Sequence, residues 1–305
     1  MAEVTFVRSR DLPVVLLCCL LFSSLARERV TADTAVQRVA VLANAAGDGD
    51  LHPCRCPGLN SSSLALRATV LKRARTGTYP SVIVDGGDFA ASPDDSLRSE
   101  LFDLFVKSME FMSYDAIGLG DAEFDLGKEA VRSAAAKLPF VCANLSDTTG
   151  WGIPAVRRLE RGGFHILITG YVDPSLVMTT GVLADPVESL KRVLPAETRD
   201  STIVILLGHG SDMELQSVLA QIPSIDVAVR GHVMEDGPAM TEIGRLPILV
   251  PERKGRNVVQ LTADFTIDGT LADRTLRTWE LKQEQRGHGK IDALVKDFET
   301  RHGLE

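Results

Sequence analysis

Four short segments of the sequence each contain glycine and one aspartate or histidine. Aspartate and histidine side chains can bind the same metal ion. The segments lie at positions 86–88, 120–121, 209–210 and 231–232, each after an apolar stretch typical of a strand. α/β folds place ligand sites where strands end. Carboxylate and imidazole groups are ligands for Zn, Mn or Fe. The sequence therefore indicates that these segments approach a shared metal centre, with candidate ligands that include Asp88, Asp121, His209 and His232.

A second group of candidate ligands lies in residues 47–57, the loop after the first apolar run. The candidates are Asp48, Asp50, His52, Cys54 and Cys56. One interpretation is an additional metal or redox site in this loop. The alternative is a surface loop with either a Cys54–Cys56 bridge or two free thiols.

The elements that must position these residues alternate along the chain, because short apolar runs are separated by amphipathic stretches. This pattern is typical of an α/β fold. Strands are expected at 38–44, 81–85, 139–144, 164–170, 202–207, 225–230 and 257–267, the last ending in a turn at Asp268-Gly269. Apolar residues at helical spacing predict helices over 97–112 and 291–298, and Gly303 is placed to end the second.

The first 32 residues are typical of a signal peptide. Arg8 and Arg10 precede an apolar run over 12–22, and small-residue cleavage patterns end at Ala26 and Ala32. This predicts export to the periplasm or the extracellular space, a domain over 33–280 and a C-terminal helix over 281–305. An uncleaved N-terminal membrane anchor is the alternative. No apolar run reaches the ~20 residues of a membrane span, so none is expected after signal removal.

Composition excludes some partners. The formal net charge is −8 and only 5% of residues are aromatic. A nucleic-acid-binding protein needs basic patches for phosphates and aromatic side chains for bases, so no nucleic-acid partner is expected. Five cysteines in 305 residues are too few for a disulfide scaffold.

A longer pattern surrounds the segment at 120–121. Residues 120–127 read Gly-Asp-Ala-Glu-Phe-Asp-Leu-Gly after Tyr114-Asp115-Ala116, and residues 139–144 read Pro-Phe-Val-Cys-Ala-Asn. With the other polar segments, this order resembles the metallophosphatase domain of the 5′-nucleotidases, within the calcineurin-like metallophosphoesterase superfamily. The resemblance runs from about residue 38 to residue 269. It implies a single-domain, four-layer α/β/β/α sandwich that hydrolyses phosphoric esters of the nucleotide type with two metals.

The same resemblance implies roles for the four predicted ligands. Asp88 matches the carboxylate shared by the two metals, and Asp121 stands where the family has asparagine. His209 and His232 match two histidines of the second metal site. This second site is therefore retained.

The first metal site departs from the family pattern. Ala45 and Gly47 stand where an aspartate and a histidine are expected, and Met234 replaces the last histidine. Ala122 replaces the catalytic histidine, so no catalytic residue is assigned. The resemblance then implies one divalent metal per chain.

These departures leave three functions open. The first is a weak hydrolase acting on a small phosphorylated molecule, because loss of a general acid typically costs about 10²- to 10⁴-fold in rate. The second is a non-catalytic relative that binds a metal or another ligand. The third is a thiol or redox accessory protein that uses Cys54 and Cys56. The sequence identifies no protein partner.

Overall fold

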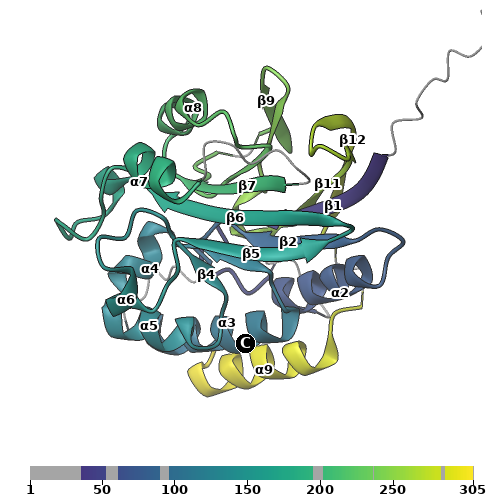
Figure 1. Cartoon of the computed structure of the whole chain (residues 1–305). Coiled ribbons are helices and arrows are strands. Elements are labelled where there is room, and N and C mark those ends of the chain that lie inside the picture. The colour runs from purple at the N-terminus through teal and green to yellow at the C-terminus, as the bar shows by residue number, and fades with distance from the viewer. Residues whose placement is uncertain are drawn as a thin grey trace, which may run out of the picture. The chain divides into compact units, whose positions relative to one another are not determined.

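The computed structural model describes residues 36–52, 61–89, 96–194, 202–235, 237–282 and 286–304. The residues from Val36 onward form one compact unit built on two six-stranded sheets (Figure 1). The signal peptide expected over 1–32 lies outside the described residues. None of the described helices is long and apolar enough to cross a membrane.

The first sheet has the strand order β12-β11-β1-β2-β3-β4. Strands β1 to β4 are parallel neighbours, and β11 and β12 extend the sheet antiparallel on the other side of β1. Their bounds are β1 (Val36–Asn44), β2 (Ser81–Asp85), β3 (Ala116–Gly118), β4 (Phe140–Val141), β11 (Asn257–Thr266) and β12 (Leu271–Glu280).

The second sheet has the order β5-β6-β7-β8-β10-β9. Its four inner strands are parallel, and β5 and β9 pair antiparallel at the two edges. The bounds are β5 (Val156–Arg161), β6 (Phe164–Val172), β7 (Thr202–His209), β8 (Val227–Arg230), β9 (Met240–Ile243) and β10 (Leu246–Leu249).

Helices cover the outer face of each sheet. Near the first sheet are α2 (Ser63–Arg75), α3 (Arg98–Met112), α4 (Asp121–Asp125), α5 (Lys128–Ala135), α6 (Thr148–Trp151) and α9 (Gly289–His302). On the second lie α7 (Pro186–Val193) and α8 (Asp212–Gln221), and two short 3₁₀ turns are η1 (Pro174–Leu176) and η2 (Arg253–Gly255). Helix α9 ends where expected, because Gly303 adopts a left-handed conformation with φ 64°.

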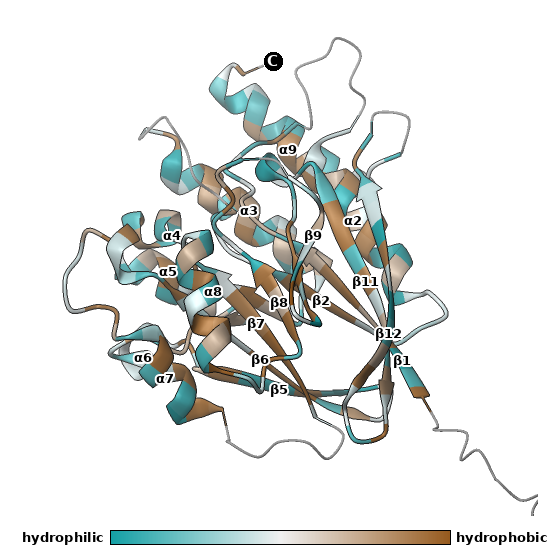
Figure 2. Ribbon diagram, turned by 90° about the horizontal axis from the view of Figure 1, so that it is seen from above, coloured by the Kyte–Doolittle hydropathy of each residue, from teal (hydrophilic) through white to brown (hydrophobic). Residues whose placement is uncertain are grey.

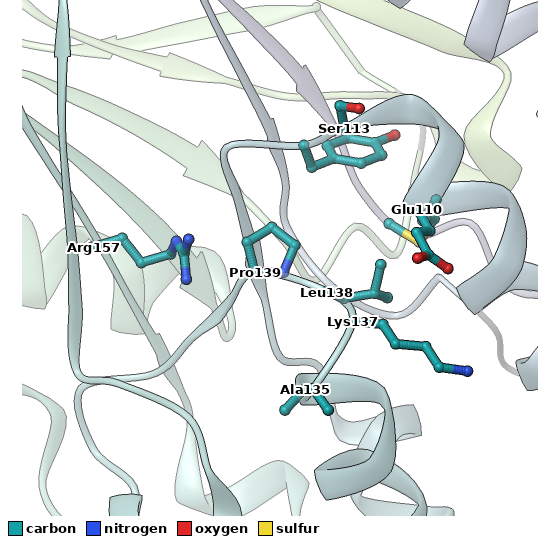
Figure 3. Close-up of a pocket in the computed structure, with 10 residues that line it drawn as sticks. Glu110, Ser113, Ala135, Lys137, Leu138, Pro139 and Arg157 are labelled. Carbon is teal, nitrogen blue, oxygen red and sulfur yellow. The ribbon is translucent and has the colours of Figure 1, made fainter.

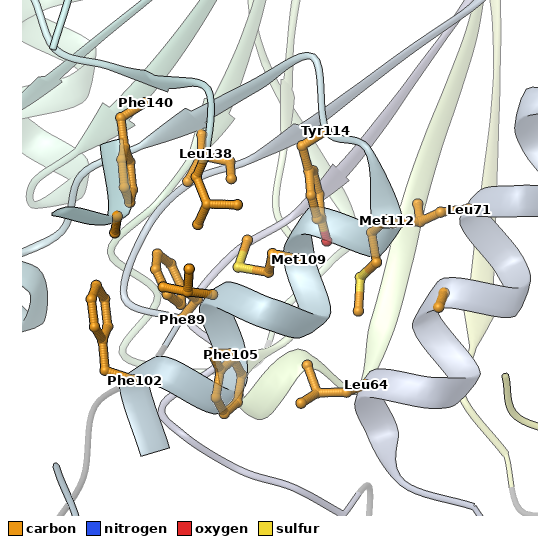
Figure 4. Close-up of a cluster of buried hydrophobic side chains, with 14 of the residues drawn as sticks. Leu64, Leu71, Phe89, Phe102, Phe105, Met109, Met112, Tyr114, Leu138 and Phe140 are labelled. Carbon is orange, nitrogen blue, oxygen red and sulfur yellow. The ribbon is translucent and has the colours of Figure 1, made fainter. Parts of the chain in front are cut away.

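Three apolar cores separate the layers. One lies between the sheets, where alternate residues such as Val41 and Ile205 face each other. A second joins the first sheet to α2, α3 and α9 and includes Phe89, which packs against Phe102 and Phe140 (Figure 4). The third joins the second sheet to α7 and α8. The order helix, sheet, sheet, helix confirms the four-layer α/β/β/α fold.

One expected strand is much shorter than its apolar pattern. The strand predicted over 139–144 is reduced to Phe140–Val141, because the next residues turn toward the second sheet. The Ala143 N–H donates to the Gly170 carbonyl at 2.6 Å, and the Asn144 side chain bonds to both the N–H and the carbonyl of Val172. This segment therefore links the two sheets.

Candidate metal centre

The four predicted ligands come together at one edge of the sandwich. Asp88 follows β2 and Asp121 follows β3, both in the first sheet. His209 ends β7 and His232 follows β8, both in the second sheet. All four strands are parallel members of their sheets, so their carboxyl ends lie at the same edge. Neighbouring polar loops from both sheets therefore face one another.

Glycine allows these loops to approach closely. A Cβ atom at Gly231 would lie 2.3 Å from the Gly86 carbonyl oxygen, and one at Gly86 would lie 2.8 Å from the Gly231 Cα. Any side chain at either position would push the loops apart. The glycines beside Asp88 and His232 thus close the two sheets around the site.

The side-chain atoms lie at distances suited to a metal. His209 Nε2 is 2.8 Å from Asp121 Oδ1 and 3.3 Å from Asp88 Oδ2. His232 Nδ1 is 3.4 Å from Asp121 Oδ1 and 3.9 Å from Asp88 Oδ2. One ligand atom from each residue lies within 4.8 Å of all the others. Tetrahedral ligands ~2.1 Å from a zinc ion are about 3.4 Å apart, so these four residues fit a divalent ion.

Without a metal, the site is a set of mutually stabilised charges. Burial opposes charge on His209, but the Asp88 and Asp121 carboxylates outweigh it and raise the pKa of His209 to about 10. Hydrogen bonds to Asp121 and Asp88 raise the pKa of His232 to about 9. Burial opposes the charge on both carboxylates, but the histidines hold the pKa of Asp121 below its usual range. A metal must therefore displace imidazole protons when it binds.

Glu123 holds the Asp88 loop in place, a role that the sequence did not reveal. Its buried carboxylate accepts the backbone N–H groups of Asp88 at 2.9 Å, Phe89 at 3.1 Å and Gly120 at 2.7 Å. Burial, followed by the charge of Asp88, raises the pKa of Glu123 to about 8. The only signal in the sequence was that residue 123 is acidic and lies in the 120–127 segment. Glu123 therefore orients the ligand loops.

The candidate ligands of the 47–57 loop have other partners where the structure describes them. Asp48 Oδ2 is 3.2 Å from Arg253 Nη2, and Asp50 Oδ2 is 3.7 Å from Lys254 Nζ. His52 Nε2 is 2.5 Å from a Glu299 carboxylate oxygen. Among the described residues, none of these three belongs to the four-ligand group. Cys54 and Cys56 lie outside the described residues.

The replaced ligand positions of the first metal site are close to this loop. Ala45 is buried, whereas Met234 is exposed and its backbone carbonyl accepts a hydrogen bond from Arg253 at 3.0 Å. A Cβ atom at Gly47 would lie 2.8 Å from the Phe89 carbonyl oxygen. The obstacle to a side chain at Gly47 is therefore steric contact with backbone. Arg253 connects the loops that follow β1 and β8.

Two other features contain none of the four ligands. A cavity of about 440 Å³ is lined by residues that precede β3 and β4, including Tyr114 and Pro139, and by Arg157 (Figure 3). Those strand starts are at the opposite edge from the ligands. Cys142 is a buried free thiol, and burial raises its pKa to about 12, which leaves it unreactive.

No family model matches the chain. A snake venom 5′-nucleotidase from Gloydius brevicauda is 27% identical over 236 residues, which cover 67% of this chain and 38% of that protein. The chain thus spans well under half the length of this relative. It matches only part of a longer protein.

Solved structures share the fold at low identity. A 5′-nucleotidase precursor from Thermus thermophilus superposes with a TM-score of 0.74 and 17% identity, covering 88% of this chain and 59% of that one. The calcineurin-like phosphoesterase YfkN from Bacillus subtilis gives a TM-score of 0.69 and 17% identity, covering 88% of this chain and 98% of that one. These likenesses agree with the resemblance of residues 114–127 and 139–144. The chain therefore has the fold of these metallophosphoesterase structures, and its sequence is similar to part of the 5′-nucleotidases.

Proposed function

We propose that this protein is a metal-dependent hydrolase of phosphoric esters, acting weakly on small nucleotide-type substrates with one divalent ion per chain. The observation that carries the proposal is the convergence of Asp88, Asp121, His209 and His232 within 4.8 Å. These residues would hold Zn, Mn or Fe. When bound, such an ion polarises a phosphoryl oxygen and lowers the pKa of a water molecule.

The chain's own cations would orient the anionic ester. Arg253 and Lys254 lie on η2, which contacts the loop after β1 through the Lys254 N–H and the Ala46 carbonyl at 2.7 Å. The Arg253 guanidinium is 39% exposed beside Asp48, so it can reach a ligand oxygen while bonding to the protein. A guanidinium matches two oxygens of one phosphate.

Weak activity follows from the residues that are missing. Ala122 has no group that could donate a proton to a leaving group, and it only donates its backbone N–H to Asp88 at 3.0 Å. Ala45, Gly47 and Met234 offer no oxygen or nitrogen side-chain ligand for a second ion. We therefore expect slow hydrolysis of activated esters and slower hydrolysis of ordinary nucleotides.

The decisive experiment measures metal content and hydrolysis together. We expect about one ion per purified chain, and slow release of nitrophenol from p-nitrophenyl phosphate with Mn²⁺ or Zn²⁺. His209→Asn and Asp121→Ala should each lose most of the metal and most of the activity. His165→Asn is the matched control, because His165 is exposed on β6, 3.5 Å from Glu160.

Two outcomes would count against the proposal. Full metal content in His209→Asn would show that the ion binds elsewhere. Metal binding without any hydrolysis of the model ester or of AMP would favour the second candidate, a non-catalytic metal-binding relative. The absence of an imidazole at Ala122 specifically favours that candidate.

We also propose that the chain is exported and that residues 1–32 are removed. The support is the basic, apolar and small-residue order of that segment. N-terminal sequencing of the mature protein should find a start near Arg27 or Asp33. An intact Met1 on protein recovered from the cytoplasm would contradict this.

A further inference from the structure

A second cavity, of about 320 Å³, lies where the end of α2 and the loop after it meet β11 and β12. Figure 2 shows α2 beside these two strands. Arg73 and Tyr79 line the cavity from the α2 side, and Gln260, Arg277 and Trp279 line it from the strands. None of these residues contributes to the candidate metal centre.

Two arginines share one aromatic ring in this cavity. The Arg277 guanidinium carbon is 3.4 Å from the centroid of the Trp279 ring, and that of Arg73 is 5.4 Å away. The Trp279 indole N–H donates to Gln260 Oε1 at 2.7 Å, which fixes the orientation of the ring. Residues 277 and 279 are two apart on one strand, so their side chains leave the same face of the sheet. The arrangement is therefore held by packing and by the fold.

The charges of these arginines are not balanced by the described protein. Nearby, Arg38 pairs with Asp264, and Arg75 pairs with Asp115. Within the described ranges, neither Arg73 nor Arg277 lies within 4.0 Å of a carboxylate, although the chain is acidic overall. Both arginines are exposed, and two like charges on one ring repel each other, so an anion bound beside them would lower that repulsion.

We propose that this cavity binds a phosphate monoester, independently of the metal centre. Near pH 7 such an ester carries close to two negative charges, which match two guanidinium groups. The Tyr79 hydroxyl accepts a hydrogen bond from Arg38 at 3.3 Å, and its own O–H can donate to a phosphate oxygen. A cavity of this size is at the lower end of small-molecule sites, so the ligand carries a small organic group.

The chain offers a direct spectroscopic test, because it has only two tryptophans. In a Trp151→Phe background the emission comes from Trp279 alone. We expect a saturable change on titration with glucose 6-phosphate in EDTA, and none with glucose or with NaCl at equal ionic strength. Sulfate should bind more weakly, because it spreads its two charges over four oxygens and has no organic group to fill the cavity.

Variants assign the response to the two arginines. Arg73→Gln and Arg277→Gln should each weaken binding about tenfold, because one charge-assisted hydrogen bond typically contributes that much to affinity. The double variant should not bind. Arg158→Gln, at an exposed arginine on β5, is the matched control and should bind normally.

An unchanged titration in the double variant would overturn the proposal, as would an equal response to NaCl. If Trp151→Phe does not fold, calorimetric titration of the unmodified chain and the arginine variants decides the same question. Binding that requires added metal and is lost in Asp121→Ala would place the ester at the metal centre instead. These results are separate from the test of hydrolysis, because EDTA abolishes only the proposed hydrolysis.

Discussion

Asp88 has a backbone φ of 54°, in the left-handed region that residues other than glycine rarely adopt. This conformation costs about 1–2 kcal/mol for a residue with a side chain. Gly87 before it has φ 95°, and Glu123 bonds to the N–H of Asp88 itself. One buried carboxylate thus stabilises the strained turn that presents a metal ligand.

Replacing Glu123 should therefore damage both stability and metal binding. Glu123→Ala leaves three buried N–H groups without their carboxylate, and we expect a loss of about 3 kcal/mol in the free energy of unfolding. Glu123→Gln should lose less, because the amide oxygen can still accept. Urea unfolding and metal titration measure the two effects. Glu110→Ala, at an exposed residue of α3, should change neither. Normal metal affinity in a folded Glu123→Ala variant would contradict the positioning role.

At the scale of elements, α8 is fixed against the end of β7, which carries His209. The Tyr171 hydroxyl of β6 donates to Glu214 Oε2 in the first turn of α8 at 2.5 Å. A Cβ atom at Gly210 would lie 2.6 Å from the same carboxylate oxygen, so a side chain beside His209 would displace the Glu214 carboxylate. Helix α8 therefore limits the path of the chain just after a metal ligand.

This contact predicts a pH dependence of stability. Burial raises the pKa of Glu214 from 4.5 to about 7, so between these values the folded protein binds more protons at this site than the unfolded chain. The contribution of Glu214 to the free energy of unfolding should then fall as pH rises from about 4.5 to about 7, and be constant outside that window. Urea unfolding of the wild type and Glu214→Gln at pH 4, 5.5 and 7.5 should show this difference. A difference that does not vary with pH would refute it.

The ease of predicting an element from the sequence depended on how deeply it is buried. Strand β7 is buried throughout and reads as a continuous apolar run, so its position and its terminal His209 were predictable. Strand β12 is mostly exposed at a sheet edge and carries residues such as Arg274 and Arg277, so no apolar pattern marked it. Glu123 could not be assigned a role, because two of its three partners, Asp88 and Phe89, come from a distant part of the chain.

At the scale of the whole molecule, a metal in this site would connect the two sheets. Two ligands follow strands of the first sheet and two follow strands of the second. The unfolded chain has no such site, so binding free energy should add to folding free energy. The gain is about 2.7 kcal/mol at a free metal concentration 100 times the dissociation constant.

Thermal unfolding with and without metal tests this connection. We expect Zn²⁺ or Mn²⁺ to raise the midpoint and EDTA to reverse the rise. The effect should shrink toward pH 5, because the imidazoles must lose protons to bind. Asp121→Ala should abolish the shift, and His165→Asn should keep it. Equal stabilisation of Asp121→Ala by the metal would contradict binding at the four ligands.

The pairing of β1 with β11 also determines when this protein can fold during its synthesis. Val36 pairs with Thr266, and the Asn44 side chain donates to the carbonyl of Asn257, 213 residues later. A ribosome adds about 5–20 residues per second, so β1 remains without its partner strand β11 for about 10–40 s. During that time its apolar edge is open to pairing with other chains. The first sheet is therefore completed only after β12, which ends at Glu280, has been synthesised, and recovery of folded protein should depend on chaperones that protect the unfinished chain.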